Sequence, residues 1–253
     1  MDSFSFWERK PWIWQLWHLP NSAYLEPAIM CGRYTLSMPI VLVAEELGLD
    51  RPEFEVEPRY NIAPTQRLPV FAQDQPNRLQ IMRWGLIPSW AKDPSVGGKM
   101  INARAETLAD KPAFRQALQQ RRCLIPADGF YEWQATGLGK IPQHIHLVGR
   151  HLITFGGLWD EWRDGEDRAL RSFTVITTAP NALMATIHDR MPLIITPENR
   201  AQWLDSATPM TDLQALMSPL PDGMLSADPV GDLVNSPRNE GPDLLQPPWP
   251  TLF

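Results

Sequence analysis

Four short segments of this sequence carry side chains that could do chemistry. The segment Met30-Cys31-Gly32-Arg33-Tyr34 places a thiol beside an arginine, and a nearby guanidinium lowers the pKa of a thiol. The other three offer an amide, a cation and a carboxylate in Ile101-Asn102-Ala103-Arg104-Ala105-Glu106-Thr107, a carboxylate in Gly129-Phe130-Tyr131-Glu132-Trp133, and an imidazole in Ile187-His188-Asp189-Arg190-Met191-Pro192. Thiol, carboxylate, imidazole and amide together suggest a nucleophilic active site.

Glu132 stands out among these groups because of its neighbours. In an extended strand, alternation places Phe130 and Glu132 on one face and Tyr131 and Trp133 on the other. Removal from water should raise the pKa of a carboxyl group set among aromatic rings, which suits a group that takes up and releases protons. Each segment also has an ordinary structural explanation, such as a small core thiol or a solvated carboxylate. The residues alone therefore support only the hypothesis of a cysteine-dependent enzyme.

Many short elements must position these segments. The pattern of a compact domain begins at Met30, whereas residues 1–29 lack both the helical and the strand period and are predicted to lie outside the fold. Strands are predicted at Cys31–Leu36, Leu79–Trp84, Arg122–Ile125, Gly129–Gln134, His144–Val148, His151–Leu158 and Phe173–Thr178, and helices at Pro39–Leu47, Lys111–Gln120, Pro197–Leu204 and Thr211–Met217, with a loop at Arg51–Arg67. This order predicts a single α+β domain with a strongly curved, mixed or antiparallel sheet.

Composition excludes several classes of protein. The chain has 253 residues, of which 43% are hydrophobic and 21% charged, as in a soluble globular protein. Its net charge of −6 gives no general attraction to a polyanion, so a nucleic-acid site would have to be a local basic patch. Two cysteines indicate no disulfide framework, and no stretch approaches the roughly 20 apolar residues of a membrane span. A cytoplasmic or nucleoid location is the default expectation.

Metal and nucleotide sites are not expected. The five histidines are scattered, and no CxxC, HExxH, GxGxxG or Walker sequence occurs. His144 and His146 share one face of a predicted strand, but paired strand histidines are more often ordinary surface or core residues. Gly97-Gly98-Lys99 lacks the rest of a phosphate-binding loop. The sequence therefore predicts no metal, no cofactor and no bound nucleotide.

Eight ordered blocks resemble the SRAP family, the abasic-site processing proteins also called SOS-response-associated peptidases. The match runs from Met30 to about Pro247. The blocks are Met30–Tyr34, Arg59–Pro64, Trp84–Pro88, Ile101–Thr107, Arg122–Ala127 through Glu132-Trp133, Thr177–Ala179, Ile187–Pro192 and Val234–Pro242. The resemblance implies one SRAP-type domain over residues 30–253, with a barrel-like sheet and peripheral helices, and a separate extension over residues 1–29.

The resemblance also implies an activity. In that family the initiator methionine is removed, and the α-amine and thiol of the exposed cysteine, here Cys31, attack the ring-opened aldehyde of an abasic site in single-stranded DNA. The product is a thiazolidine, a covalent protein–DNA crosslink that protects the lesion. Carried over, Glu132 moves protons, His188 acts as acid or base near the sugar hydroxyl, and Asn102 orients the reacting groups. The second cysteine, Cys123, is expected to be a structural core residue.

DNA binding is implied by the same resemblance. Arg33, Arg104 and Arg190 are assigned to phosphates, and Trp84 and Trp133 to the shape of the cleft and to stacking on bases. Single strands are generally held in this way, by cations along the backbone and aromatic platforms under the bases. A monomer without a membrane or nucleotide partner is expected.

One departure from the family pattern concerns the nucleophile. Cys31 follows 30 residues, so its nitrogen as written is an amide, which cannot form a Schiff base. We favour Met30 as the true initiator; alternatively the preceding residues are removed by self-cleavage, and if they are retained only thiol chemistry remains. Two further functions stay open: a cysteine peptidase or hydrolase that uses Cys31, His188 and Glu132, and a noncovalent single-strand-binding module.

Overall fold

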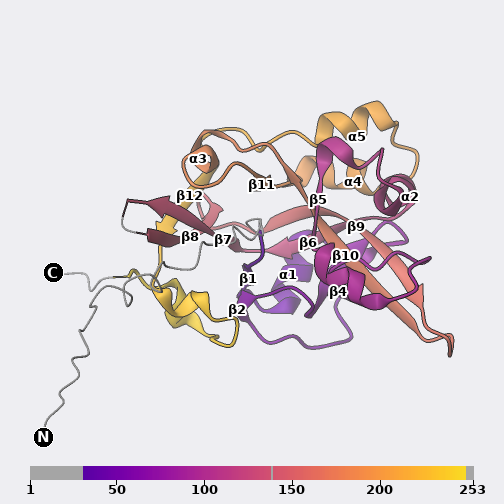
Figure 1. Ribbon diagram of the computed structural model, residues 1–253, viewed down its shortest axis with the longest axis horizontal. Helices are drawn as coiled ribbons and strands as arrows, with labels where there is room; N and C mark the ends of the chain where they lie inside the picture. Colours follow the sequence, from indigo (N-terminus) through magenta and orange to yellow (C-terminus); the bar gives the residue numbers. More distant parts are fainter. Residues whose placement is uncertain (1–30, 138, 249–253) are drawn as a thin grey trace, which may run out of the picture.

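Two β-sheets and several short helices build the protein (Figure 1). The computed structural model describes residues 31–137 and 139–248, so the predicted extension over residues 1–29 lies outside the described residues. The strands are β1 (Tyr34–Leu36), β2 (Arg59–Ile62), β3 (Arg67–Ala72), β4 (Gln75–Trp84), β5 (Asn102–Arg104), β6 (Arg122–Ala127), β7 (Gly129–Thr136), β8 (Gly139–Leu147), β9 (Ile153–Arg163), β10 (Ala169–Thr178), β11 (Met191–Pro192) and β12 (Leu225–Pro229). The helices are α1 (Ile40–Leu47), α2 (Pro112–Gln120), α3 (Ala182–Ala185), α4 (Arg200–Leu204) and α5 (Met210–Leu216), with 3-10 turns at η1 (Pro94–Lys99), η2 (Ala105–Thr107), η3 (Pro197–Asn199), η4 (Asp232–Asn235) and η5 (Pro242–Leu245).

The larger sheet closes on itself. Its strand order is β11-β10-β4-β3-β6-β9, and β9 also pairs with β10, so β10, β4, β3, β6 and β9 form a five-strand barrel. Most neighbours in it are antiparallel, but β10 runs parallel to β4 and to β5. Closure leaves the barrel without a free edge. The predicted α+β fold with a curved, mixed, barrel-like sheet and peripheral helices is confirmed.

The smaller sheet, in the order β12-β8-β7-β1-β2, is antiparallel and packs against the barrel through β1. The ring of Tyr34 meets Trp84 of β4 at 5.3 Å and Phe155 of β9 at 5.8 Å between centroids, both edge-on. These rings belong to one buried core shared by the two sheets. Phe130 of β7 joins that core, whereas Tyr131 joins a small second cluster on the other face of the strand. The predicted alternation along β7 is thus confirmed.

Strands are more numerous than the sequence pattern predicts, and several are longer, whereas the predicted strand Cys31–Leu36 is shorter because β1 begins only at Tyr34, where the pairing with β2 and β7 begins. The prediction of a loop over Arg51–Arg67 is wrong where β2 lies, because this strand carries polar residues that pair with β1. β3 was not predicted because Pro69 argues against a strand interior. β4 begins at Gln75 instead of Leu79, since its polar first residues carry no apolar pattern. The predicted helices are present within about a residue of their bounds, the third of them opening as η3 before α4.

Arg122 lies at the start of β6 and is completely buried. Its hydrogen bonds connect two helices to the barrel. Its guanidinium donates to the carbonyl oxygens of Leu118 (2.6 Å) and Gln119 (2.9 Å) at the end of α2. It also donates to Trp203 (2.6 Å) and Asp205 (2.6 Å) at the end of α4. Carbonyl groups at a helix end lack partners within the helix, so Arg122 satisfies four of them at once.

We predict that Arg122→Met will destabilise the protein by about 3 kcal/mol, because it leaves buried carbonyl groups without a donor. Urea unfolding followed by tryptophan fluorescence measures the change. Arg115→Met is the matched control, since Arg115 is exposed on α2, and it should change stability by less than about 0.5 kcal/mol. Equal effects of the two variants would contradict this role of Arg122.

Candidate active site

Cys31 and Glu132 are in direct contact. The backbone nitrogen of Cys31 donates a hydrogen bond to Oε1 of Glu132 over 2.6 Å. The pairing of β1 with β7 explains the contact: Tyr34 lies opposite Phe130, so the antiparallel register brings the residues before β1 alongside Glu132. Both residues are buried, with 5% of Cys31 and 3% of Glu132 exposed. Two of the predicted catalytic residues, 101 positions apart, therefore meet in a site shielded from water.

Burial controls the proton affinities of this pair. Removal from water raises the pKa of the Glu132 carboxyl, opposed by the hydrogen bond from Cys31 and by the nearby His188. This direction was predicted from the aromatic neighbours of Glu132 and is confirmed. Burial also raises the pKa of the Cys31 thiol, and the Glu132 carboxylate raises it further. The prediction that a cation beside the cysteine lowers the thiol pKa is wrong in its net direction, because burial prevails over the opposing charge of Arg190.

The backbone at Cys31 is strained. Its φ angle of 44° lies in the left-handed region, which residues with a side chain seldom adopt. Such a conformation costs on the order of 1 kcal/mol and persists where the surroundings enforce it. Here the surroundings include the hydrogen bond to Glu132 and the anchoring of Tyr34 in the core. The residue with the strained backbone is therefore the predicted nucleophile.

His188 lies in the segment between α3 and β11. Its Nδ1 is 3.2 Å from the backbone nitrogen of Arg190 and 2.9 Å from Oδ1 of Asp189. Nδ1 accepts from the backbone when the ring is neutral and pairs with the exposed Asp189 when it is protonated. Because both contacts use Nδ1, proton exchange with a reactant falls to Nε2. The ring is near enough for its charge to lower the pKa of Glu132.

Arg190 and Arg104 stand on the same side of the site. Arg190 forms two hydrogen bonds with the carboxylate of Glu106, at 2.6 and 2.8 Å, and a third with the backbone oxygen of Thr177 at 2.6 Å. Its charge reaches Cys31, where it favours the thiolate. Arg104 is exposed on β5, and the same strand carries the partly buried Asn102. Any phosphate that binds Arg190 would have to share it with Glu106.

Arg33 and Trp133 are held by the strap, as we call residues 234–240, which begins within the last two residues of η4. Arg33 donates from Nη1 to the backbone oxygen of Val234 and to Oδ1 of Asn61, both at 2.9 Å. Trp133 donates from its indole nitrogen to Oδ1 of Asn235 at 2.7 Å, and the Arg33 guanidinium lies 6.0 Å from the Trp133 ring. This places the predicted cation and the predicted aromatic platform beside each other.

Asn61 was missed as a site residue, although it is completely buried. Its amide nitrogen donates to the backbone oxygens of Ser236 (2.9 Å) and Asn239 (3.1 Å) while its oxygen accepts from Arg33. Asn61 therefore fixes the strap and Arg33 together. The signal was available in the sequence, because Asn61 stands in the second resembling block and Asn239 in the last.

Trp84 does not face the cleft, and the prediction that it stacks on bases is wrong. Its side chain is completely buried, lies parallel to Phe173 at 6.3 Å between ring centroids, and donates to the backbone oxygen of Ile101 at 2.9 Å. That hydrogen bond holds the residue just before Asn102. Trp84 therefore supports β5 from inside the barrel. Cys123 is a fully buried core residue, as predicted.

His144 and His146 form a structural pair on β8. Both are buried, with ring centroids 5.7 Å apart, and His146 lies 3.1 Å from Oδ2 of Asp228. Burial lowers the pKa of His144 to about 4, so this ring is neutral at physiological pH. Within residues 31–137 and 139–248, no group of three or more histidine, cysteine or acidic residues could hold a metal ion.

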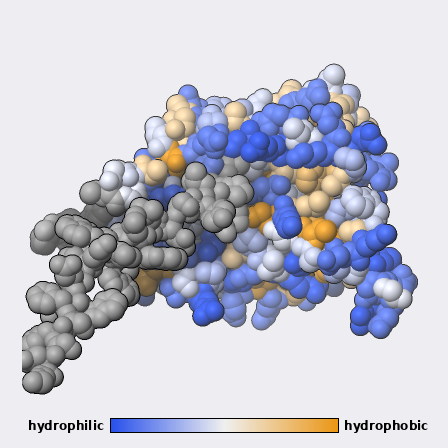
Figure 2. Space-filling model, in the orientation of Figure 1, coloured by the Kyte–Doolittle hydropathy of each residue, from blue (hydrophilic) through white to orange (hydrophobic). Residues whose placement is uncertain are grey.

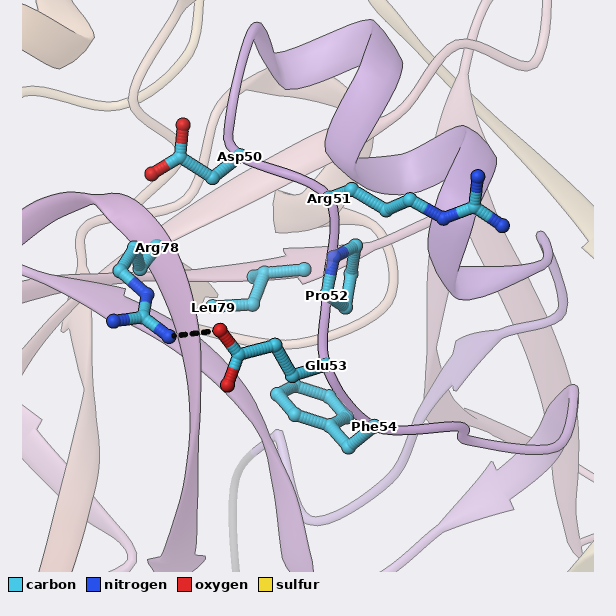
Figure 3. Close-up of a pocket in the computed structure, with 7 residues that line it drawn as sticks. All are labelled: Asp50, Arg51, Pro52, Glu53, Phe54, Arg78 and Leu79. Atoms are coloured by element: carbon cyan, nitrogen blue, oxygen red, sulfur yellow. Dashed lines mark hydrogen bonds and ion pairs between the residues drawn. The ribbon is translucent and has the colours of Figure 1, made fainter.

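A separate hollow lies apart from these residues. Its volume is about 70 Å³, and it lies between the segment after α1 and the strand β4 (Figure 3). Glu53 pairs there with Arg78 at 3.0 Å. The hollow contains none of the predicted catalytic side chains.

Hydrophilic residues cover most of the face drawn in Figure 2, and hydrophobic ones lie near its middle. None of the described helices is long and apolar enough to cross a membrane.

Comparison with known proteins assigns the chain to a family. The model of the SOS response associated peptidase (SRAP) family matches residues 30–237, which include every predicted catalytic residue. The chain belongs to the SRAP family. The family predicted from the eight sequence blocks is thus confirmed, and the contact between Cys31 and Glu132 lies within the SRAP match.

Relatives of this SRAP chain carry consistent names. The abasic site processing protein YoqW of Bacillus subtilis is 47% identical over 222 residues, spanning 86% of this chain and 99% of that protein. The abasic site processing protein YedK of Escherichia coli is 31% identical over 227 residues, spanning 86% of this chain and all of that protein. A crystal structure of a protein from Bacteroides thetaiotaomicron, 27% identical, superposes with a TM-score of 0.79 over 86% of this chain and 99% of that one.

We predict that Glu132→Gln will lower the pKa of the Cys31 thiol. The carboxylate is the second cause of the raised thiol pKa after burial, and glutamine removes its charge while keeping a similar shape. The rate of alkylation by a small reagent, measured against pH in a Cys123→Ala background, should rise at lower pH in the variant. An unchanged or higher midpoint would contradict the role assigned to Glu132.

Proposed function

We propose that this chain captures abasic sites in single-stranded DNA as a covalent thiazolidine, using Cys31 as its first residue once Met30 has been removed. The observation that carries the proposal is the 2.6 Å contact between the Cys31 nitrogen and the buried carboxylate of Glu132. Membership of the SRAP family supports it, as do the relatives named abasic site processing proteins. Residues 30–253 form the working domain in this proposal, and residues 1–29 are dispensable.

The first step joins the amine to the abasic aldehyde. An α-amine titrates near about 7.7 to 8.0, so a useful fraction is uncharged at physiological pH, unlike a lysine near about 10.4. Glu132, with its raised pKa, accepts a proton from the amine and returns it to the departing hydroxyl of the carbinolamine. One water leaves, and a Schiff base links Cys31 to C1′ of the sugar.

The second step closes the ring. The Cys31 thiol adds across the carbon–nitrogen double bond, its sulfur bonding to C1′ and its proton going to the nitrogen. Because thiol and imine belong to the same residue, the reaction is effectively intramolecular. Since burial keeps the thiol protonated, Glu132 is placed to receive and pass on this proton. Closure removes the electron sink that would drive strand scission, so the lesion is protected.

His188 and Asn102 act on the sugar in this proposal. Nε2 of His188 exchanges a proton with the sugar hydroxyl and so assists ring opening, or reversal of the crosslink. Asn102, on β5 next to the exposed Arg104, orients the reacting groups by hydrogen bonds. His188 is partly buried, and it lies close enough to Glu132 for its charge to lower the pKa of that carboxyl, which supports this role.

DNA is held by local cations in spite of the net charge of −6. Arg33, Arg104 and Arg190 bind phosphates, and Trp133 stacks on a base. The exposure of Arg104 and the closeness of Arg33 to Trp133 support these assignments. Trp84 is not included among the DNA-binding residues, because its side chain is completely buried. The protein acts as a monomer on single-stranded DNA and uses no cofactor.

The crosslink is tested with the chain that begins at Met30 and single-stranded DNA carrying one abasic site. A heat-stable band of reduced mobility is expected, absent in Cys31→Ala and retained in Cys123→Ala. Glu132→Gln should form it at least about tenfold more slowly, the effect of losing a general base. A band that survives in Cys31→Ala, or none with the parent chain, would overturn the proposal. A noncovalent binding module would bind this DNA equally well with and without Cys31.

We infer a second activity, self-removal of residues that precede Cys31. The strained φ of Cys31 and the hydrogen bond from its nitrogen to Glu132 support it. The thiol attacks the carbonyl carbon of Met30, the Cys31 nitrogen leaves with a proton from Glu132, and water hydrolyses the thioester to a free thiol and a carboxylate. The intact mass of the full chain should fall to that of residues 31–253 over time, but not in Glu132→Gln or Cys31→Ala. Cleavage of unrelated peptides would instead indicate a general peptidase.

A further inference from the structure

Two arginines lie side by side on the outer face of the barrel, on the neighbouring strands β3 and β4. The antiparallel register of β3 and β4 places Arg67 directly opposite Arg83. Their neighbours Leu68 and Met82 point into the core, so both arginines point outward, Arg67 exposed and Arg83 half-buried. Like charges directly opposite on neighbouring strands destabilise a sheet. A pairing of this kind needs a compensating interaction.

No carboxylate supplies that compensation within the described part of the chain. Among residues 31–137 and 139–248, no acidic group lies within 4 Å of the charged nitrogens of Arg67 or Arg83, and Arg83 donates from Nη1 to the backbone oxygen of Gly85 at 3.2 Å. Acidic residues elsewhere on the barrel pair with other cations: Asp74, in the turn between β3 and β4, pairs with Arg171 at 2.8 Å, and Asp160 of β9 pairs with Arg121 at 2.6 Å. The Arg67–Arg83 pair therefore presents uncompensated positive charge.

A glycine turn seats one of these arginines. A Cβ atom added to Gly97 would lie 2.7 Å from Nη1 of Arg83, and one added to Gly85 would lie 2.5 Å from the backbone oxygen of Gly97. Only glycines allow η1 to approach Arg83 this closely. The exposed Lys99 ends the same turn. The motif Gly97-Gly98-Lys99, which fits no nucleotide loop, thus adjoins the arginine pair.

Hydrogen bonds and neighbouring residues of β2 link the arginine pair to the proposed active site. The backbone of Trp84, next to Arg83, exchanges hydrogen bonds with Thr65 and Gln66, both at 2.9 Å. Gln66 accepts from Arg59 of β2 at 2.9 Å, and β2 carries Asn61, which holds Arg33. An unbroken series of direct contacts thus connects the arginine pair to the cations around Cys31.

We propose that Arg67 and Arg83, with Lys99 beside them, form a phosphate-binding subsite for the sugar–phosphate backbone of a nucleic-acid strand whose reacting nucleotide lies at Cys31. The inference rests on the proposed function, since it extends the path of the captured strand. Phosphate anions between the guanidinium groups turn the repulsion across β3 and β4 into attraction. The subsite reads charge and not base sequence.

The test measures binding of undamaged, fluorescent oligothymidine of about 20 nucleotides as a function of salt. The double variant Arg67→Gln/Arg83→Gln should bind about tenfold more weakly at low salt, and the slope of log affinity against log salt should fall by about 1. The control Arg51→Gln/Arg115→Gln removes two other exposed arginines and should change the slope by less than half as much. Equal slopes for the two double variants would overturn the proposal.

Two further measurements sharpen the result. Loss of repulsion should leave the Arg67→Gln/Arg83→Gln protein at least as stable to heat as the parent, so weak binding cannot be ascribed to unfolding. Inorganic phosphate should displace the oligothymidine no better than chloride at equal ionic strength; strong displacement would mean a site for free phosphate and would overturn the strand assignment. Because the DNA is undamaged, failure of crosslinking at Cys31 would refute the proposed function without altering this outcome.

Discussion

The hydrogen bond between the nitrogen of Cys31 and the carboxylate of Glu132 is the interaction on which the site depends. Because both groups are buried, water does not compete for either of them. Burial raises the pKa values of the carboxyl and of the thiol alike, so both groups favour their protonated, uncharged forms more than they would in water. The nitrogen and thiol of Cys31, the two nucleophiles of the proposed mechanism, thus lie with the Glu132 carboxyl in one buried site.

The fold serves this contact from several sides. Tyr34, locked between the two sheets, fixes the register of β1 against β7 and with it the approach of Cys31 to Glu132. The segment before β11 brings His188, and the strap secures Arg33 through Asn61. The site therefore forms where the barrel, the smaller sheet and the strap meet. Its geometry depends on tertiary packing and not on any one element.

Much of this arrangement follows from the sequence, but not its register or its long-range contacts. The raised pKa of Glu132 could be predicted because its aromatic neighbours adjoin it in the chain. The raised pKa of the Cys31 thiol could not be predicted, because it depends on burial and on the charge of Arg190, which is distant in sequence. Trp84 was assigned to the cleft by the family resemblance, and alternation along β4 could not correct this because it does not say which face of a strand is buried. The pairing of Arg67 with Arg83 could not be predicted either, because β3 contains a proline and was not predicted as a strand.

The intact mass of the protein–DNA adduct tests the central claim most directly. Protein that begins at Cys31 is mixed with an abasic oligonucleotide, and the product is weighed before and after treatment with a thiol-alkylating reagent in a Cys123→Ala background. A thiazolidine predicts the sum of the two masses less one water, with no mass added by the reagent, because the sulfur is bonded to C1′. An adduct of that mass whose thiol still reacts would be an open Schiff base, and it would contradict the account.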